Sequence, residues 1–379
     1  MNIFKMTIFP FLLIIFSFTF PVVCYGAVVY PRTSWETRTP QQIAINKGKL
    51  QEVSSFISSK GGGDGIIIYK GYNVWTWANI NTKGNIASAA KSFTSTILGL
   101  AIDDGKCSLN QKVTDFDNSL TGKDRNITFF HFTTMTSGYG MSSNPGASWY
   151  YNDEAMNKFA DILDIVWNEP IQNVLKRRIM DPIGANNWSW SGGGAGNDST
   201  FQAEPEDLAR FGWLFANQGN WNGQQLISAS WVEEAHKDQV SVSGMDVYGF
   251  NWWTNANPSQ GWPDVPQGAF GAFGYNGQYF VFVFPERELV GAHRGPYEME
   301  TVSEGEPGEN NIFRTIIAAL LTETSRCTSF TYNAWGTCQS NNTQTRTVAT
   351  QSPTGCTGGS PILLDLARIP SRFHKMGKG

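Results

Sequence analysis

The sequence predicts an α/β protein of the α+β kind, with an antiparallel sheet built from strands near both ends of its main domain. Strand-like runs occur at 66–70 and 73–77, and period-two patterns return after residue 248. Between these regions the apolar residues follow helical spacing. We therefore expect one sheet of N- and C-terminal strands, covered by helices, with a mostly helical region inserted between its halves.

The N-terminal half of this sheet is expected to be a hairpin. Ile66–Lys70 and Asn73–Trp77 flank Gly71-Tyr72, a spacing typical of two strands joined by a tight turn. The preceding stretch Gln41–Ser59 has apolar residues near one helical stripe and is the expected first helix.

A serine and a lysine in the next segment, Asn85–Gly105, are the candidate catalytic pair. Ser88 and Lys91 are three positions apart, and apolar residues recur at helical spacing from Phe93 onward. Ser88 is therefore expected at the first turn of a buried helix, with Lys91 on the same helix face. A serine hydroxyl becomes a nucleophile when a base takes its proton, and a lysine serves as that base if its pKa is lowered.

An S-x-x-K match alone is weak, because about one or two are expected by chance in a chain of this length. Its position at a helix start, after a strand pair, makes a catalytic role for this match more credible.

A second pattern lies downstream, where Tyr150-Tyr151-Asn152 gives the chain's single Y-x-N. We expect Tyr150 to relay the proton and Asn152 to bind the substrate carbonyl.

The rest of the domain is divided between helices and strands. Helices are expected over Ile127–Thr136, Ala155–Lys176, Glu204–Asn217 and Trp231–His236, and an apolar helix over Asn310–Leu321. Strands are expected over Tyr248–Trp253, within Gly268–Tyr275, and over Gln278–Phe284 and Leu289–His293, the last two as a hairpin.

His131 lies in an aromatic helix, and we expect a packed core residue there rather than a catalyst. We reject the glycine run Gly192–Gly194 as a phosphate cradle because its flanks do not predict a strand and a following helix.

Composition argues against several function classes. The chain has 379 residues, 41% of them hydrophobic, and a formal net charge of −4. The near-neutral charge and the lack of a basic run argue against a nucleic-acid partner. We expect no cofactor and no metal.

The first residues predict export. Lys5 precedes the apolar run Met6–Val23, and small residues follow, so residues 1–26 are expected to be a cleaved signal peptide. An uncleaved anchor is the alternative, because the run has about 18 residues. No other stretch is apolar for long enough to span a bilayer. The mature protein is thus expected to be secreted or periplasmic, without a membrane span.

Three of the chain's five cysteines and a shift in composition define the C-terminal part. Residues 27–325 form the expected main domain, and residues 326–379 a separate segment rich in Thr, Ser, Asn and Gly. Its cysteines, Cys327, Cys338 and Cys356, suggest disulfides in an exported protein, although their number is odd. Cys107 is expected to be a buried or semi-buried thiol, and Cys24 to leave with the signal peptide.

Taken together, these motifs resemble the β-lactamase-related serine hydrolases: class C β-lactamases, D,D-peptidases, family VIII esterases and 6-aminohexanoate-dimer hydrolases. The resembling stretches stand in family order over about Ile43–Leu321. They are Ser88–Ser95, Met135–Gly138, Tyr150–Asn152, Asp207–Gly212, Tyr248–Trp253 and Gly277–Tyr279. The resemblance implies a β-lactamase/transpeptidase-like fold and catalysis by Ser88, Lys91 and Tyr150 through an acyl-enzyme.

One departure affects the expected substrate. The family's Lys-Thr-Gly strand is here Gly268–Gly274, where either Ala269-Phe270-Gly271 or Ala272-Phe273-Gly274 fills the slot and neither supplies a cation. Backbone groups of Ala272 and Gly274 are the expected substrate contacts, and Arg294 is the candidate to replace the missing cation.

The prediction is an esterase or amidase acting on a small molecule, with a β-lactamase, a D,D-peptidase or a non-catalytic binding protein of the same fold as alternatives. The stretch from Cys327 to Cys356 also resembles a small thrombospondin-type module.

Overall fold

The computed structural model describes residues 28–43, 45–59, 62–191, 200–242, 245–256, 262, 265–274, 279–295, 329–332 and 348–352. The signal-peptide segment, the helix expected at Asn310–Leu321, Gly192–Gly194, and all cysteines except Cys107 lie outside these residues. The chain divides into a compact unit, Val28–Arg326, and a second unit formed by residues 1–27 and 327–379. In the second unit, β14 (Ser329–Tyr332) pairs antiparallel with β15 (Val348–Ser352).

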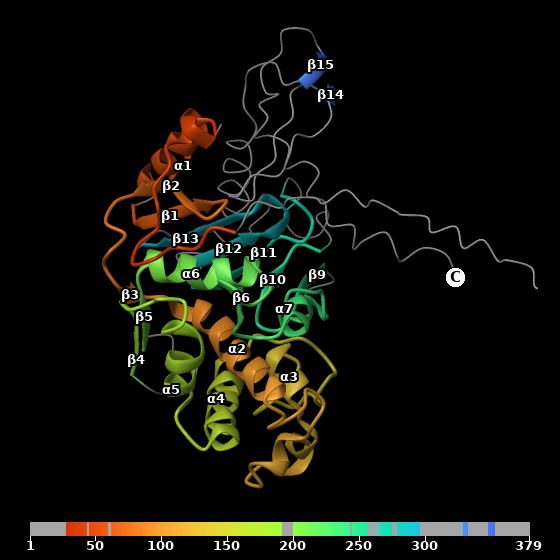
Figure 1. The fold of residues 1–379 in the computed structure, drawn as a ribbon. Helices are drawn as coiled ribbons and strands as arrows, with labels where there is room; N and C mark the ends of the chain where they lie inside the picture. Colours follow the sequence, from red (N-terminus) through yellow and green to blue (C-terminus); the bar gives the residue numbers. More distant parts are fainter. Residues whose placement is uncertain are drawn as a thin grey trace, which may run out of the picture. The chain divides into compact units, whose positions relative to one another are not determined.

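Helices and strands alternate along the larger unit (Figure 1). The helices are η1 (Pro40–Ile43), α1 (Lys47–Ser59), η2 (Ala87–Ala89), α2 (Ala90–Asp103), η3 (Val113–Asp115), η4 (Gly122–Asn126), α3 (Phe129–Thr133), α4 (Asp153–Trp167), α5 (Ile171–Leu175), the π-helical turn η5 (Lys176–Met180), α6 (Pro205–Ala216), α7 (Ala229–Ala235) and η7 (Pro285–Arg287). The strands are β1 (Asp64–Tyr69), β2 (Tyr72–Trp77), β3 (Gly84–Asn85), β4 (Ser189–Trp190), β5 (Phe201–Ala203), β6 (Asn220–Trp221), β7 (Gln224–Gln225), β8 (Val240–Val242), β9 (Met245–Tyr248), β10 (Trp253–Thr254), β11 (Phe270–Gly274), β12 (Tyr279–Phe284) and β13 (Leu289–Arg294).

The main sheet joins the two ends of the domain, as the sequence predicts. Its eight strands run in the order β2-β1-β13-β12-β11-β10-β9-β8, and every neighbouring pair is antiparallel. The first hairpin turns at Lys70 and Gly71, both with positive φ (54° and 80°), which is the geometry of a tight two-residue turn. The helical region lies between β2 and β8 in the chain, which confirms the expected insertion.

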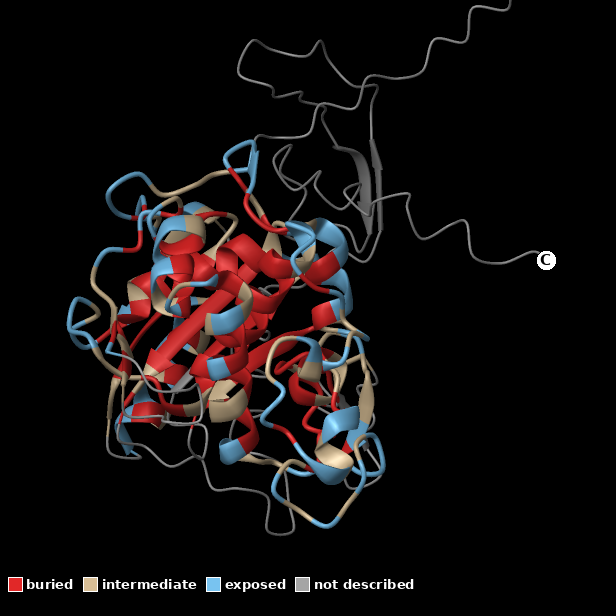
Figure 2. Cartoon of the chain, turned by 90° about the horizontal axis from the view of Figure 1, so that it is seen from below, coloured by how far each residue is buried: buried red, intermediate tan, exposed pale blue. Residues whose placement is uncertain are grey.

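Each face of the sheet is covered by a different set of helices. Ile66 and Ile68 of β1 belong to the core shared with α2 and α6, while Ile67 belongs to the core shared with α1. This alternation follows from the two-residue period of a strand. Gly212 lets α6 approach the sheet closely, because a Cβ there would lie 2.6 Å from Val290. Figure 2 shows the buried residues running through the sheet and its adjacent helices.

Two expected elements are divided in the structure. The helix expected over Ala155–Lys176 ends at Trp167, because Asn168 adopts a left-handed conformation (φ 54°) and Pro170 precedes α5. The strand expected over Tyr248–Trp253 is a turn between β9 and β10, with Asn251 at φ 58°. Both breaks occur where a residue with a left-handed backbone conformation interrupts a segment whose apolar periodicity continues.

The Asp-Leu-Ala-Arg stretch of α6 holds the surrounding loops together. Asp207 accepts a 2.7 Å hydrogen bond from the backbone N–H of Asn187. The fully buried Arg210 donates to the backbone carbonyls of Ile183 (3.0 Å) and Thr33 (2.9 Å). This family motif is therefore structural in the chain.

Next to it lies Glu204, a buried carboxyl between β5 and α6. Burial raises its pKa from 4.5 to about 7, and a hydrogen bond from the Asn187 side chain opposes the shift. Burial also raises the pKa of Asp207, to about 6. A carboxyl with a raised pKa stabilises the fold fully below its unfolded pKa, and this contribution is lost as the pH rises through the folded value.

The first prediction concerns this carboxyl. We expect the melting temperature of the wild-type protein to fall between pH 5 and pH 8 more steeply than that of Glu204→Gln, which has no proton to lose at this position. Thermal unfolding followed by circular dichroism measures the two slopes. Glu233→Gln is the control, because Glu233 is exposed, and it should keep the wild-type slope. Equal slopes for Glu204→Gln and the wild type would contradict the assignment.

Candidate active site

Ser88 lies on a strained turn that presents it away from the core. It is the middle residue of η2, between Ala87 and Ala89, which are 4% and 1% exposed, while Ser88 is partly exposed. Ala87 has φ 47°, and its N–H donates a 2.7 Å hydrogen bond to the Asn85 side chain. A non-glycine residue in this conformation requires support from its surroundings, and such strain clusters at functional sites.

Lys91 is buried next to this serine. Its side chain is 2% exposed, and Nζ lies 2.8 Å from Ser88 Oγ and 2.8 Å from Asp153 Oδ1. The same nitrogen lies 4.9 Å from the centre of the Tyr151 ring. The pairing of Ser88 with Lys91 is thus present as expected, and the acidic partner is a residue that the sequence analysis did not single out.

Tyr151 completes the group. Its hydroxyl is hydrogen-bonded with Ser88 and with Lys91. Burial raises the pKa of the Tyr151 phenol, and the charge of Lys91 and these hydrogen bonds oppose that shift. Burial outweighs the opposing effects, so the pKa of Tyr151 is raised. Tyr151 therefore keeps its proton at neutral pH and is a hydrogen-bond donor in this group.

The tyrosine beside Ser88 and Lys91 is therefore Tyr151, one position after the tyrosine expected from the sequence. Tyr150, the residue assigned from the Y-x-N pattern, is 54% exposed, and Tyr151 takes its place beside Ser88 and Lys91. Asn152, assigned to the substrate carbonyl, is the N-cap of α4: its Oδ1 accepts from Ala155 N (3.0 Å) and its Nδ2 donates to Tyr139 O (2.9 Å). The relevant pattern is thus Tyr151-Asn152-Asp153.

A capping signal in the sequence could have revealed this shift. Asn152 followed by Asp153 and Glu154 is a typical helix start, with an amide as the cap and acids in the first turn. An asparagine used as a cap has its side chain engaged. Successive residues of an extended segment point in opposite directions, so Tyr150 and Tyr151 cannot both face Lys91.

A closed loop brings Tyr151 to this place. The backbone N–H of Tyr150 donates 2.9 Å to the carbonyl of Met135, which joins the two ends of the loop. Within it, the N–H of Gly146 donates 2.8 Å to the carbonyl of Thr136. Met135–Gly138 and the Asn144-Pro145-Gly146 segment are therefore the parts of the chain that close this loop.

Asn251 ties three elements to the turn between β9 and β10. It is 3% exposed, its carbonyl accepts a 2.6 Å hydrogen bond from Ser92 Oγ of α2, and its N–H donates 2.8 Å to Thr133 O of α3. Its Nδ2 is 3.4 Å from Tyr248 Oη. This turn fixes α2, and with it Lys91, against the end of the sheet.

The glycine- and phenylalanine-rich strand β11 packs beside the Ser88 turn. Ala272 belongs to the core on the α2 side of the sheet, and Gly274 shares its strand face by the two-residue period. Phe273 belongs to the opposite core, against Trp262. Arg294, the guess for a substrate-binding cation, forms an ion pair with Asp64 of β1, so its charge is compensated there.

Two other candidate side chains have structural surroundings. His131 Nδ1 accepts a 3.1 Å hydrogen bond from the N–H of Thr128 and so caps α3. Cys107 is a buried free thiol, and burial raises its pKa to about 12. In the described part of the chain, no group of His, Cys, Asp and Glu is placed to hold a metal ion, and no helix is long and apolar enough to cross a membrane.

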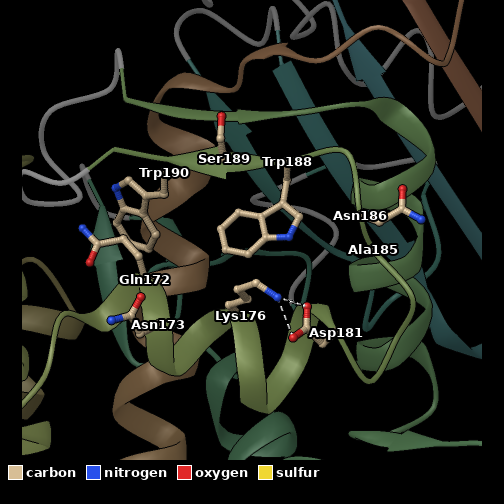
Figure 3. A pocket seen from close by; sticks show the side chains of 9 residues that line it. All are labelled: Gln172, Asn173, Lys176, Asp181, Ala185, Asn186, Trp188, Ser189 and Trp190. Atoms are coloured by element: carbon tan, nitrogen blue, oxygen red, sulfur yellow. Dashed lines mark hydrogen bonds and ion pairs between the residues drawn. The ribbon is translucent and has the colours of Figure 1, made fainter.

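A pocket of about 390 Å³ lies elsewhere, between β4 and the α5–η5 helix (Figure 3). Figure 3 shows Trp188, which precedes β4, and Trp190 of β4 extending toward the helix, with Lys176 and Asp181 paired below Trp188. Lys176 Nζ donates a 2.6 Å hydrogen bond to Asp181 Oδ1. Its serine, Ser189, accepts a hydrogen bond from Lys83 at 3.3 Å, but this lysine is exposed. We therefore place the candidate active site at Ser88, where the lysine is buried.

Comparisons with known proteins agree with this fold. A family model described as Beta-lactamase matches residues 62–294. An uncharacterized protein of Alkalihalophilus pseudofirmus is 21% identical over 248 residues, which are 55% of this chain and 72% of that protein.

Solved structures resemble the chain in fold. A candidate beta-lactamase from Bacteroides dorei has a TM-score of 0.61 at 14% identity, covering 73% of this chain and 99% of that one. A candidate 6-aminohexanoate-dimer hydrolase from Bacillus anthracis has a TM-score of 0.59 at 16% identity, covering 78% and 89%. With the family model spanning more than half of the sequence, the chain belongs to the beta-lactamase family.

Proposed function

We propose that the chain is a serine hydrolase that cleaves a small ester or amide through an acyl-enzyme on Ser88. The observation that carries this proposal is the 2.8 Å separation of Ser88 Oγ from Nζ of the buried Lys91. The apolar run at the N-terminus supports a place outside the cytoplasm for this activity.

The proposed reaction follows from the contacts of these side chains. The resting Lys91 ammonium first loses a proton to solvent, and the amine then takes the Ser88 hydroxyl proton while Oγ bonds to the substrate carbonyl carbon. Asp153, 2.8 Å from Nζ, stabilises the ammonium that forms. Backbone N–H groups of Ser88 and β11 are proposed to stabilise the oxyanion.

Tyr151 is proposed to pass the proton to the leaving group, since its hydroxyl contacts both Ser88 and Lys91. The bond between the carbonyl carbon and the leaving oxygen or nitrogen then breaks. A water repeats the sequence in reverse: it loses a proton to Lys91, attacks the acyl carbon and releases Ser88 with its proton restored.

Loss of the nucleophile is the direct test. With 4-nitrophenyl butyrate, a chromogenic cephalosporin and a linear 6-aminohexanoate dimer as substrates, we expect turnover of the ester or the linear amide. Ser88→Ala should lower kcat/KM by about 10³-fold or more while circular dichroism stays unchanged. Parent-like hydrolysis by Ser88→Ala would contradict the proposal, and fast cephalosporin turnover would favour the β-lactamase alternative.

The one-residue shift in the tyrosine has its own test. Tyr151→Phe should lower kcat/KM by about 10²- to 10⁴-fold, because the ring remains but the proton donor is lost. Tyr150→Phe is the matched control, and we expect its activity to stay within about twofold of the wild type, because exposed surface changes have small effects. A large loss in Tyr150→Phe with little loss in Tyr151→Phe would restore the assignment made from the Y-x-N pattern.

A further inference from the structure

The pocket between β4 and the α5–η5 helix has the features of a ligand site that the chemistry at Ser88 does not use. Its volume of about 390 Å³ lies within the range of small-molecule sites, roughly 300–1,000 Å³. Neither Ser88 nor Lys91 lines it. The lining includes two tryptophans, two side-chain amides and an ion pair: Trp188, Trp190, Gln172, Asn173, Lys176 and Asp181.

Trp188 gives this pocket an aromatic wall. The residue lies just before β4 and is half-buried. Its ring stacks on Phe201 of β5, with ring centres 5.6 Å apart and planes at 28°, so one face of the indole is covered and held in place. Figure 3 shows the ring extending into the space above the helix. A fixed aromatic ring of this kind provides a flat apolar surface for a ligand.

Side-chain amides supply polar contacts on the helix side of the pocket. Gln172 and Asn173 of α5 lie below Trp190 in Figure 3. Gln172 Oε1 is buried and, among the described residues, has no hydrogen-bond partner. Such an acceptor is unfavourable unless a water or a ligand pairs with it. An amide has both donors and an acceptor, and a hydroxyl group is likewise donor and acceptor, so the two are well matched.

The charges at this pocket are neutralised in pairs. Residues five apart in an α-helix lie roughly 140° apart around its axis. In the π-helical turn η5, however, the N–H of Asp181 donates 2.8 Å to the carbonyl of Lys176, and Lys176 Nζ donates 2.6 Å to Asp181 Oδ1. Arg177 and Arg178 of the same turn also form ion pairs with carboxylates. These pairs favour an uncharged ligand over an anion.

From these features we infer that the pocket binds a neutral pyranose sugar. A pyranose ring has an apolar C–H face, which fits the indole of Trp188, and a rim of hydroxyl groups, which fits the amides and the paired charges. The inference goes beyond the proposed function, because it adds a second ligand site and requires no reaction at Ser88.

Isothermal titration calorimetry of the full chain tests the inference with two neutral trisaccharides, cellotriose and N,N′,N″-triacetylchitotriose. We expect saturable binding of one or both, and none of hexane-1,6-diol, which has hydroxyl groups but no pyranose ring. In 0.5 M NaCl the Kd should stay within about twofold, because salt screens only interactions between charges.

Two variants locate the bound sugar. Trp188→Ala should raise the Kd about tenfold, because the aromatic surface is lost. Asn173→Ala should raise it about threefold or more through the loss of a hydrogen bond. Asn173 is exposed, so this variant keeps the test valid if circular dichroism shows that Trp188→Ala is unfolded. Ser88→Ala is the control and should bind with the wild-type Kd.

Several outcomes would overturn the inference. These are no saturable binding of either trisaccharide, wild-type Kd values in both pocket variants, or a Kd that rises steeply with NaCl, which would indicate a charged ligand. Loss of binding in Ser88→Ala would place the sugar at the candidate active site instead. Binding is measured without turnover, so failure of the proposed hydrolase function would leave these results unaffected.

Discussion

The burial of Lys91 is the constraint on which the rest of the site depends. An ammonium that is 2% exposed is costly unless oxygen atoms replace its water, and Ser88 Oγ and Asp153 Oδ1 each do so at 2.8 Å. Keeping these oxygens in place requires a fixed turn before α2 and a fixed start of α4. The hydrogen bonds of Asn85 and Asn152 supply these two fixed points.

The same constraint explains why several family motifs contain no reacting group. The Tyr248–Trp253 stretch forms the turn that holds α2 through Asn251, and Met135–Gly138 closes the loop that carries Tyr151. Asp207 and Arg210 hold the loops before α6. These residues hold the candidate site in place without forming part of it, so an order of motifs along a chain predicts the fold better than it predicts the individual residues of a site.

The sequence predicted the fold well because its signals were local and repeated. The two hairpins at the ends of the domain and the helical period between them predicted one antiparallel sheet with a helical insertion, but not the order of its strands. Breaks at Asn168 and Asn251 were missed, since left-handed residues interrupt a segment whose apolar pattern continues. Short strands such as β3 and β5 have only two or three residues and give no periodic signal.

The site was predicted in part for a related physical reason. Ser88 and Lys91 share one helical turn, so their spacing alone places them together. Tyr151 and Asp153 reach Lys91 through a loop and a helix cap, and the choice between Tyr150 and Tyr151 depends on which residue begins α4. Asp153, the acidic partner of Lys91, is the first residue of α4. The apolar pattern alone predicts that this helix begins at Ala155, two residues too late.

The most direct test of the central claim is covalent labelling of the purified chain with a fluorophosphonate, followed by mass spectrometry of its peptides. A nucleophile activated by Lys91 reacts at Ser88 alone, and Lys91→Ala abolishes the adduct. An adduct on Ser189 or on another serine, or equal labelling of Ser88 in Lys91→Ala, would contradict the account.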